Sequence, residues 1–319
     1  MQMLITGGMG FIGAALARHL LDAGHRVRIF DDASRGDPRR LADLAHRIDF
    51  VRGDIRNAEE VLNSSNGCNM IWHLAAVNGT QNFYEAPDRV IDVGIRGTVN
   101  VVQAACSNQV QRLVFVSSSE VYGDALQIPT PETHSLTIPD PTNPRFSYAG
   151  SKIAGELLCL HLGPARGLET VIVRPHNIYG PDMGMDHVIP QLIEKMITAA
   201  EGKEDQEVEI SIEGTGSETR AFCYIDDCVR GLSLAGMEGD SSAIYHLGTE
   251  NEIDINHLSQ LIANALDLRV TAQPSDRRPG SPMRRCPATE KLRLLGFEAR
   301  ISLSEGLAKT VSWHKKQHR

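Results

Sequence analysis

The chain has 319 residues, which is enough to form one large domain or two fused lobes. Of these residues 41% are hydrophobic, and the formal net charge is -8. The acidic balance argues against general nucleic-acid binding, and neither a membrane span nor a signal peptide is predicted from the apolar runs or the start of the chain. The six cysteines are scattered without metal-ligand spacing, so we expect reduced thiols in a cytoplasmic protein and no metal site.

Short apolar runs alternate with longer helical patterns up to about residue 180. The predicted strands are Met3–Thr6, Arg26–Phe30, Asp49–Arg52, Met70–Leu74, Leu113–Ser117 and Thr170–Arg174. The predicted helices are Gly10–Ala23, a short one after Asn57, Val90–Ser107 and Tyr148–Leu162. This alternation predicts an α/β fold with a Rossmann-type doubly wound parallel sheet, whose ligands bind at the carboxyl ends of the strands.

The character of the sequence changes near Tyr179. A turn-rich loop precedes a predicted helix at Ile189–Ala200 and an acidic, exposed stretch at Glu201–Glu207. The segment Gln273–Pro287 holds four prolines and four arginines, so we expect a loop there. We therefore predict a Rossmann domain at 1–178, with its sheet completed by 219–247, and mainly a smaller substrate-binding lobe at 179–319.

A glycine-rich turn joins the first predicted strand to the first helix, in the run Thr6-Gly7-Gly8-Met9-Gly10-Phe11-Ile12-Gly13. Glycines permit a tight turn and close approach of the backbone to a pyrophosphate, and the helix N-terminus supplies free N–H groups. Asp31 follows at the end of the second strand, where a carboxylate can accept hydrogen bonds from ribose hydroxyls and repels a 2′-phosphate. This context predicts dinucleotide binding with NAD favoured, while Arg28 and Arg35 keep NADP as the alternative.

Tyr148 and Lys152 stand four residues apart, so a helix would carry both side chains on one face. An ammonium beside a phenol favours the phenolate and lowers the pKa of the tyrosine. Such a tyrosine can take a proton from a sugar or alcohol hydroxyl near neutral pH. The same spacing also occurs on solvated helices, where the two residues would be an ordinary surface pair.

Nine short segments, in this order along the chain, resemble the extended short-chain dehydrogenase/reductases that act on nucleotide sugars, the NAD-dependent epimerase/dehydratase group. They are TGGMGFIG (6–13), FDD (30–32), GDI (53–55), HLAA (73–76), SSSEVYG (117–123), YAGSK (148–152), RPHNIYGP (174–181), TRAFCYIDD (219–227) and PGSPMRR (279–285). The resemblance covers essentially the whole chain. It implies NAD as cofactor, a nucleotide sugar (a UDP-sugar above all) as substrate, and neither nucleic acid nor membrane as partner. It also implies a homodimer through a four-helix bundle, built from Val90–Ser107 and Tyr148–Leu162 of each subunit.

The resemblance implies a role for each matching residue. Ser118 would hydrogen-bond the hydroxyl that is oxidised, Tyr148 would be the base, and Lys152 would hold the nicotinamide ribose. The implied cofactor contacts are Gly7, Gly10, Phe11, Ile12, Gly13, Asp31, Asp32, Asp54, Ile55, Leu74, Ala75, Ala76, Ser117, Tyr148, Lys152 and Pro175. The implied substrate contacts are Ser118, Ser119, Asn177, Val188, Arg220 and Arg278. Asn177 could instead be a turn residue and Arg278 a solvated loop cation, and we expect His73 and His176 to be hydrogen-bonded packing residues.

Glu120 bears on the fate of the sugar once it has been oxidised. In this group a 4-keto sugar takes the hydride back on its other face, loses carbon dioxide when it is a uronic acid, or loses water with the help of an acid/base pair. In this group a Glu at the position of Glu120 is typical of decarboxylases and dehydratases. Dehydratases, however, have Asp where this chain has Ser119. Decarboxylases have an acidic residue in the segment that reads Ala149-Gly150-Ser151 here. Glu120 could also be a buried acceptor that fixes its loop.

The chain departs from the habits of the group at three further places: Gly94 replaces a usual Asn, Gly280-Ser281 a frequent Gly-Asp, and Ala288 a frequent Asp. These changes weaken any transfer of fine sugar or nucleotide contacts. We predict an NAD-dependent nucleotide-sugar epimerase. The alternative is a decarboxylase or dehydratase that uses Glu120 as acid/base, and a remote one is a non-catalytic NAD-binding regulatory protein.

Overall fold

The computed structural model describes residues 1–202, 206–277 and 280–318. Within these ranges the centre is a seven-stranded sheet of order β3–β2–β1–β4–β5–β6–β11, in which every neighbouring pair is parallel. Its strands are β1 (Gln2–Thr6), β2 (Arg26–Asp31), β3 (Ile48–Arg52), β4 (Met70–His73), β5 (Arg112–Val116), β6 (Glu169–Pro175) and β11 (Ala243–Leu247). The strand order reverses between β1 and β4, so the predicted doubly wound α/β fold is confirmed.

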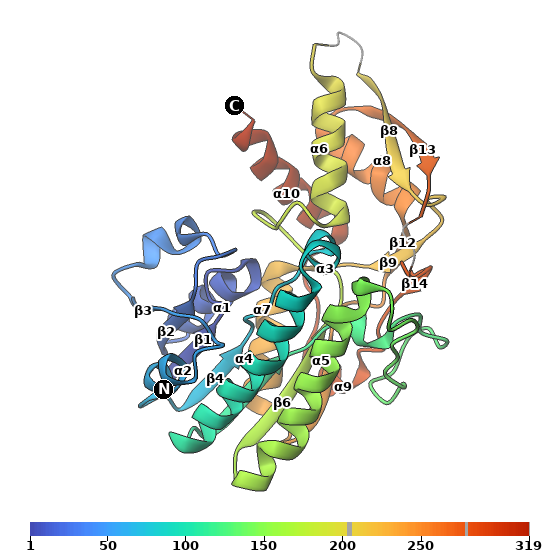
Figure 1. Cartoon of the computed structure of the whole chain (residues 1–319). Helices are drawn as coiled ribbons and strands as arrows, with labels where there is room; N and C mark the ends of the chain where they lie inside the picture. The colour runs from blue at the N-terminus through green and yellow to red at the C-terminus, as the bar shows by residue number, and fades with distance from the viewer. Residues whose placement is uncertain (203–205, 278–279, 319) are drawn as a thin grey trace.

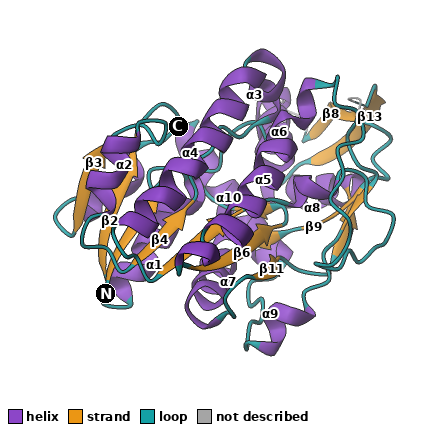
Figure 2. Ribbon diagram, turned by 60° about the horizontal axis from the view of Figure 1, so that its bottom comes forward, coloured by secondary structure: helices purple, strands orange, loops and turns teal. Residues whose placement is uncertain are grey.

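Helices cover both faces of this sheet (Figures 1 and 2). One face carries α1 (Phe11–Asp22) and α7 (Ile225–Glu238), and the other carries α2 (Ala58–Ser65), α4 (Pro87–Ser107) and α5 (Ser147–Leu157). Because successive strand residues point to opposite faces, Met3 and Ile5 join one hydrophobic core while Leu4 joins the other. The layers leave the strand ends open to a ligand.

The predicted strands and helices lie within a few residues of the observed ones, with one exception at the end of α5. The predicted helix Tyr148–Leu162 ends as α-helix at Leu157 and continues as a π-helical turn at Leu158–Leu162. Short 3-10 turns lie at Pro38–Leu44 (η1), Ser119–Tyr122 (η2), Pro144–Phe146 (η3) and Pro164–Arg166 (η5).

A smaller lobe is built mainly from the C-terminal part of the chain (Figure 1). Here α6 (Val188–Ala200), α8 (Ile255–Leu266) and α10 (Leu303–Gln317) pack with the sheet of β8 (Glu207–Glu213) and β13 (Arg269–Ser275). Short pairings accompany it: β7 (Ile178–Tyr179) with β10 (Cys223–Tyr224), and β9 (Thr219–Ala221) with β12 (Glu252–Asp254) and β14 (Arg284–Arg285). The remaining helices are α3 (Thr80–Glu85) and α9 (Glu290–Leu294). The chain returns from this lobe to the central sheet through α7 and β11.

The prediction of a loop throughout Gln273–Pro287 is wrong in part. Its first three residues continue β13, and Arg284 and Arg285 form β14. Among the described residues β13 pairs only with β8, so it is an edge strand. An edge strand tolerates Pro274, because the missing N–H can face away from the ladder.

No helix in the described part of the chain has both the length and the apolar character that crossing a membrane requires. Of the predicted exposed stretch Glu201–Glu207, residues 201, 202, 206 and 207 are exposed, and the others lie outside the described residues.

Candidate active site

A cavity of about 390 Å³ lies at the carboxyl ends of the central strands. Its wall takes residues that end or follow β1, β2, β4, β5 and β6, as expected for a parallel sheet of this topology. The predicted site residues on the wall are Gly7, Gly10, Phe11, Ile12, Gly13, Asp31, Asp32, Asp54, Ile55, Leu74, Ala75, Ala76, Ser117, Ser118, Ser119, Glu120, Tyr148, Lys152, Pro175 and Asn177. Segments spread over 170 positions of the sequence thus share one cavity.

The glycine-rich turn lets the backbone come closer to its surroundings than a side chain would permit. A Cβ on Gly7 would lie 2.7 Å from the Ala75 nitrogen, and one on Gly13 would lie 2.2 Å from the Gly7 oxygen. Gly7 also has a φ of +71°, which favours glycine. Gly10 caps α1 without a side-chain hydrogen bond, so first-turn N–H groups beside the cavity remain available to an anion.

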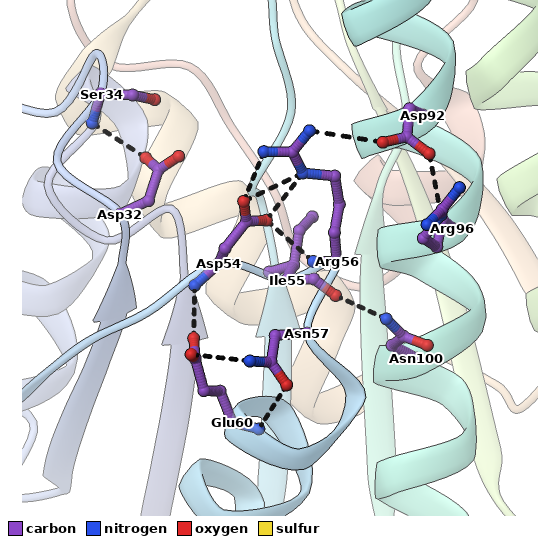
Figure 3. Close-up of polar contacts among 10 residues, drawn as sticks. All are labelled: Asp32, Ser34, Asp54, Ile55, Arg56, Asn57, Glu60, Asp92, Arg96 and Asn100. Carbon is purple, nitrogen blue, oxygen red and sulfur yellow. Dashed lines mark hydrogen bonds and ion pairs between the residues drawn. The ribbon is translucent and has the colours of Figure 1, made fainter.

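Asp31 ends β2 with its carboxylate fixed by two backbone donors. Met9 N donates to Oδ2 and Ala33 N to Oδ1, each at 2.9 Å. Burial raises the pKa of Asp31, and these two hydrogen bonds oppose that rise. The next carboxylate, Asp32, accepts from Ser34 N at 2.9 Å (Figure 3). Two acidic side chains therefore stand where a ribose is expected.

The arginines that kept NADP as an alternative have other partners. Arg28 pairs with Asp49 at 2.6 Å, and Arg35 donates to Asn78 O. Arg28 is off the cavity wall, and Arg35 is on it but donates to Asn78. With the carboxylate of Asp31 also on the wall, the arrangement favours ribose hydroxyls over a 2′-phosphate.

The loop after β3 is tied to α4 (Figure 3). Arg56 donates to Asp54 Oδ2 through Nε at 2.9 Å and NH2 at 2.6 Å, and its NH1 lies 3.3 Å from Asp92. Asn100 Nδ2 donates to Ile55 O at 2.9 Å. These contacts hold Asp54 and Ile55 on the cavity wall.

The segment after β5 and the start of α5 bring the catalytic candidates together. Ser118 caps the η2 turn and accepts from Glu120 N at 3.2 Å. Tyr148 is 6% exposed and stacks on Phe83, with 5.0 Å between ring centroids. The Ser118 hydroxyl is within reach of the Tyr148 phenol, and its hydrogen bond lowers the pKa of Tyr148.

The expected influence of Lys152 on Tyr148 is absent from this arrangement. Burial, and then the charge of Glu120, raise the pKa of Tyr148 above its ordinary value. Lys152 donates from Nζ to Val116 O at 2.7 Å, and Nζ lies 5.6 Å from the Tyr148 ring centroid. Burial lowers the pKa of Lys152 to about 8. The predicted lowering of the tyrosine pKa is wrong for the chain by itself, because the ammonium points at β5 and not at the phenol.

Glu120 is held between two arginines. Its Oε1 accepts from Arg285 NH1, and its Oε2 lies 3.7 Å from Arg145 NH2. Burial alone would raise the pKa of Glu120, but Arg285 and then Arg145 outweigh burial and bring it to about 2. Arg145 is 8% exposed, and its Nε has no hydrogen-bond partner among the described residues. Glu120 is therefore a fixed carboxylate in a positively charged corner, as in the interpretation that it fixes its loop.

A buried ion pair lies beneath this loop. Arg174 donates to Glu156 through Nε at 2.8 Å and NH2 at 2.5 Å, and both side chains are 2% exposed. Ser117 donates to Glu156 Oε1 at 2.5 Å, and Arg174 donates to the Tyr122 hydroxyl. These bonds fix both ends of the segment that carries the candidate catalytic serine.

The two histidines next to the cofactor motifs differ. His73 lies 2.7 Å from Thr6 Oγ1 and 3.1 Å from Thr98 Oγ1, so the prediction of a hydrogen-bonded packing residue is confirmed. His176 is buried, and neither ring nitrogen has a partner in the described part of the chain, so that prediction is wrong for it. Its ring packs on His246 instead, at 4.7 Å between centroids. Burial lowers the pKa of both His73 and His176, so both are neutral.

Comparison with known proteins agrees with this geometry. A model of the NAD dependent epimerase/dehydratase family matches residues 3–248. The chain belongs to this family. It is 30% identical to the UDP-N-acetyl-alpha-D-glucosaminuronate decarboxylase of Bacillus cytotoxicus, over 99% of this chain and 98% of that protein.

Two solved structures show the same architecture. The UDP-glucose 4-epimerase of Thermotoga maritima, with UDP-glucose, has a TM-score of 0.89 and 27% identity, and the match covers 100% of both chains. The dTDP-glucose 4,6-dehydratase DesIV of Streptomyces venezuelae, with NAD bound, has a TM-score of 0.88 and 28% identity, over 100% of this chain and 98% of the other. The predicted family, enzyme class and NAD cofactor are thereby confirmed for this epimerase/dehydratase.

The residues of this epimerase/dehydratase fit NAD. The close backbone approach at Gly7 and Gly13 and the uncapped start of α1 suit the diphosphate, and Asp31 suits the adenosine ribose. Lys152 lines the same cavity as these groups.

Two predicted substrate residues of this epimerase/dehydratase lie off the cavity wall, and one lies outside the described residues. Val188 begins α6, next to His187, which does line the cavity. Arg220 is engaged by backbone carbonyls, donating to Thr219 O at 2.7 Å and Pro282 O at 2.9 Å. Arg278 is the residue outside the described ranges.

Asn177 lines the cavity but also has the features of a turn residue. Its φ is +42°, and its Nδ2 donates to Ala221 O at 3.0 Å. Asn is among the residues that tolerate this left-handed conformation. The amide therefore joins β9 to the end of β6, whatever else it contacts.

Four basic wall residues had no predicted role: Arg40, Arg89, His187 and Arg285. Arg35, also on the wall, was considered only as a sign of NADP. Arg35 and Arg40 follow Asp31 closely, and Arg285 ends the PGSPMRR segment, so their positions near motifs were a usable signal. Which of several neighbouring arginines faces inward depends on pairings such as that of β14 with β9, where Arg285 lies opposite Arg220.

Proposed function

We propose that this enzyme is a nucleotide-sugar 4-epimerase acting on a UDP-sugar. Tyr148, as phenolate, takes the proton of the sugar C4 hydroxyl while Ser118 holds that hydroxyl by a hydrogen bond. When bound, NAD would supply the acceptor for the hydride of C4 and the source from which it is returned. The 4-keto sugar turns over in the cavity, and Tyr148 gives the proton back to the C4 oxygen. Among the chain's own groups, the Ser118 hydrogen bond and the charge of Arg35 lower the pKa of Tyr148, against the larger upward effect of burial and Glu120.

The state of Glu120 is the observation that supports epimerisation over dehydration. Loss of water requires a group that delivers a proton to the leaving hydroxyl. Glu120 has a pKa of about 2 between its arginine partners, so it carries no proton near neutral pH. Epimerisation needs no such donor, because one base removes and returns the same proton.

Decarboxylation of a hexuronic acid is the second candidate, and the arginines around Glu120 favour it. Arg285, Arg145 and Arg220 all act on this one carboxylate, so the corner has an excess of positive charge. Arg285 is the one of these arginines that lines the cavity, where its guanidinium can donate to a sugar carboxylate. Once C4 is a ketone, the bond between C5 and the carboxylate can break, with carbon dioxide leaving and the electron pair passing to the ketone. This step needs no protonated Glu120.

The test is to incubate the purified enzyme separately with UDP-glucose, UDP-glucuronic acid and the corresponding GDP- and dTDP-linked sugars, and to measure product masses and retention times. We expect the C4 epimer of UDP-glucose, with unchanged mass and altered retention. Loss of carbon dioxide from the uronic acid alone would select the second candidate. Loss of water from a UDP- or dTDP-hexose would contradict the role given to Glu120. The proposal itself would be contradicted if the enzyme turned over none of the UDP-, GDP- or dTDP-linked hexoses and hexuronic acids.

Replacing Glu120 by Gln should shift the pH dependence of kcat. The carboxylate raises the pKa of Tyr148, so its removal lowers that pKa. A base acts only after losing its proton, so the rate rises with pH through this pKa, and the rising limb should move to lower pH in Glu120→Gln. A pH series of kcat measures this, with the exposed loop variant Asp140→Asn as the control that should not shift. A limb displaced to higher pH, or a complete loss of turnover at all pH values, would show that Glu120 has another role.

We also propose a cytoplasmic homodimer, formed through α4 and α5 of each subunit. The two helices pack side by side, and each exposes a large apolar residue: Ile91 is 44% exposed and Leu157 53%. The cytoplasmic location is supported by the cysteines, since all six are free and five are buried. Sedimentation should give twice the subunit mass of 34.9 kDa, and Leu157→Glu should give the subunit mass. A wild-type monomer at micromolar concentration would refute the dimer.

A further inference from the structure

A single arginine connects the glycine-rich turn to the loop that precedes α6. We call residues 182–187 of that loop the strap. Arg40, in η1, donates to Asp182 through Nε (2.6 Å to Oδ2) and NH2 (3.1 Å to Oδ1 and 2.9 Å to the backbone oxygen). Its NH1 also donates to Met9 O at 3.1 Å. The guanidinium thus joins the turn expected to hold a diphosphate to a segment more than 140 positions away.

A second contact runs parallel to the first. Arg35 NH2 lies 3.5 Å from Asp186 Oδ2 at the other end of the strap. Gly79 leaves space for this contact, since a Cβ there would lie 2.4 Å from Asp186 Oδ2 and 3.2 Å from Arg35 NH2. Both arginines line the cavity, and so do three strap residues, Met183, Gly184 and His187. The strap and the loop after β2 therefore share one stretch of wall.

Asp182 has a backbone conformation that few residues with a side chain tolerate. Its φ is +61°, a region that glycine occupies at less cost than a residue with a side chain. An aspartate at this position keeps a bidentate acceptor that glycine would lack. The pair is also partly shielded from water, since the side chain of Arg40 is 16% exposed and that of Asp182 34%. Such a pair is worth more than a fully solvated one.

We propose that Arg40 and Asp182 form a latch that holds the strap against the cofactor side of the cavity and so slows the release of bound NAD. Arg40 is in this view a positioning residue. An enzyme that takes a hydride from its substrate and later returns it must keep the reduced cofactor bound in between. The latch serves that need whichever fate the keto sugar has, so the inference does not depend on the choice between epimerase and decarboxylase.

The test follows the release of NADH by its fluorescence, with no sugar present. Asp182→Asn removes the charge but keeps a residue that tolerates a positive φ. Asp182→Asn and Arg40→Gln should each raise the dissociation rate of NADH about tenfold, as a coupling of about 1.4 kcal/mol gives. If the two side chains act as one latch, the double variant should release NADH no faster than either single variant.

The matched control is Asp43→Asn. Asp43 lies in the same η1 turn and also accepts two hydrogen bonds from one arginine, Arg18, at 2.6 and 2.9 Å, but this pair is not on the cavity wall. It should leave the dissociation rate unchanged. An unchanged rate in Asp182→Asn would overturn the proposal. Additive effects of the two substitutions on the dissociation rate would also overturn it, because Arg40 would then act through Met9 alone. An equal increase of the dissociation rate in Asp43→Asn would overturn it as well. A failed sugar assay would leave this result untouched, because NADH is the probe.

Discussion

Replacing Tyr148 by Phe should lower kcat by about 10²- to 10⁴-fold, the usual contribution of a general base. The change removes one oxygen and keeps the ring, so stacking on Phe83 and burial are retained. The binding of NADH should therefore persist while proton removal from the sugar fails. Initial rates with saturating nucleotide sugar, together with NADH fluorescence titration, measure the two effects separately.

Tyr84→Phe is the control for this change. Tyr84 lies on α3, is 39% exposed, and does not line the catalytic cavity, so it should keep full activity. Undiminished turnover in Tyr148→Phe would remove the phenol from the mechanism.

The sheet and the cofactor turn could be predicted because their signals are local. An apolar run such as Met3–Thr6 followed by Gly7, Gly10 and Gly13 identifies a strand, a turn and a helix start within a dozen residues. Parallel topology then brings the ends of distant strands to one edge. The shared location of Asp31 at the end of β2 and Ser118 after β5 followed from these rules, whereas that of Tyr148 on α5 was implied by the resemblance to the family.

The electrostatics of the site could not be predicted, because they depend on contacts between distant residues. Glu120 meets Arg285 across 165 positions of sequence, and the contact depends on how β14 pairs with β9. The direction of Lys152 is a matter of side-chain packing as well. Helical spacing correctly put it on the face of Tyr148, but Val116 O is the acceptor that it reaches. Spacing identifies a shared face, whereas pKa depends on the particular partner and on burial.

Arg174→Met should lower the free energy of unfolding by about 3–5 kcal/mol, the usual cost of leaving one partner of a buried ion pair alone. Both Arg174 and Glu156 are 2% exposed, so water cannot replace the lost donors. The Ser117 hydroxyl would remain as a donor to Glu156, but it carries no compensating charge. Since domains of ordinary stability have about 5–15 kcal/mol in total, urea denaturation should show a large shift of the midpoint.

Arg18→Met is the matched control for this prediction, because burial is what differs between the two pairs. Arg18 also makes a two-pronged contact, with Asp43 at 2.6 and 2.9 Å, but the side chains are 44% and 61% exposed. Its loss should cost at most about 1 kcal/mol. Adding Glu156→Gln to Arg174→Met should recover part of the stability, because the unpaired charge is then gone. Equal costs for Arg174→Met and Arg18→Met, or no recovery in the double variant, would mean that packing and not charge burial makes this pair matter. In that case the network under Ser117 would fix the catalytic loop by shape alone.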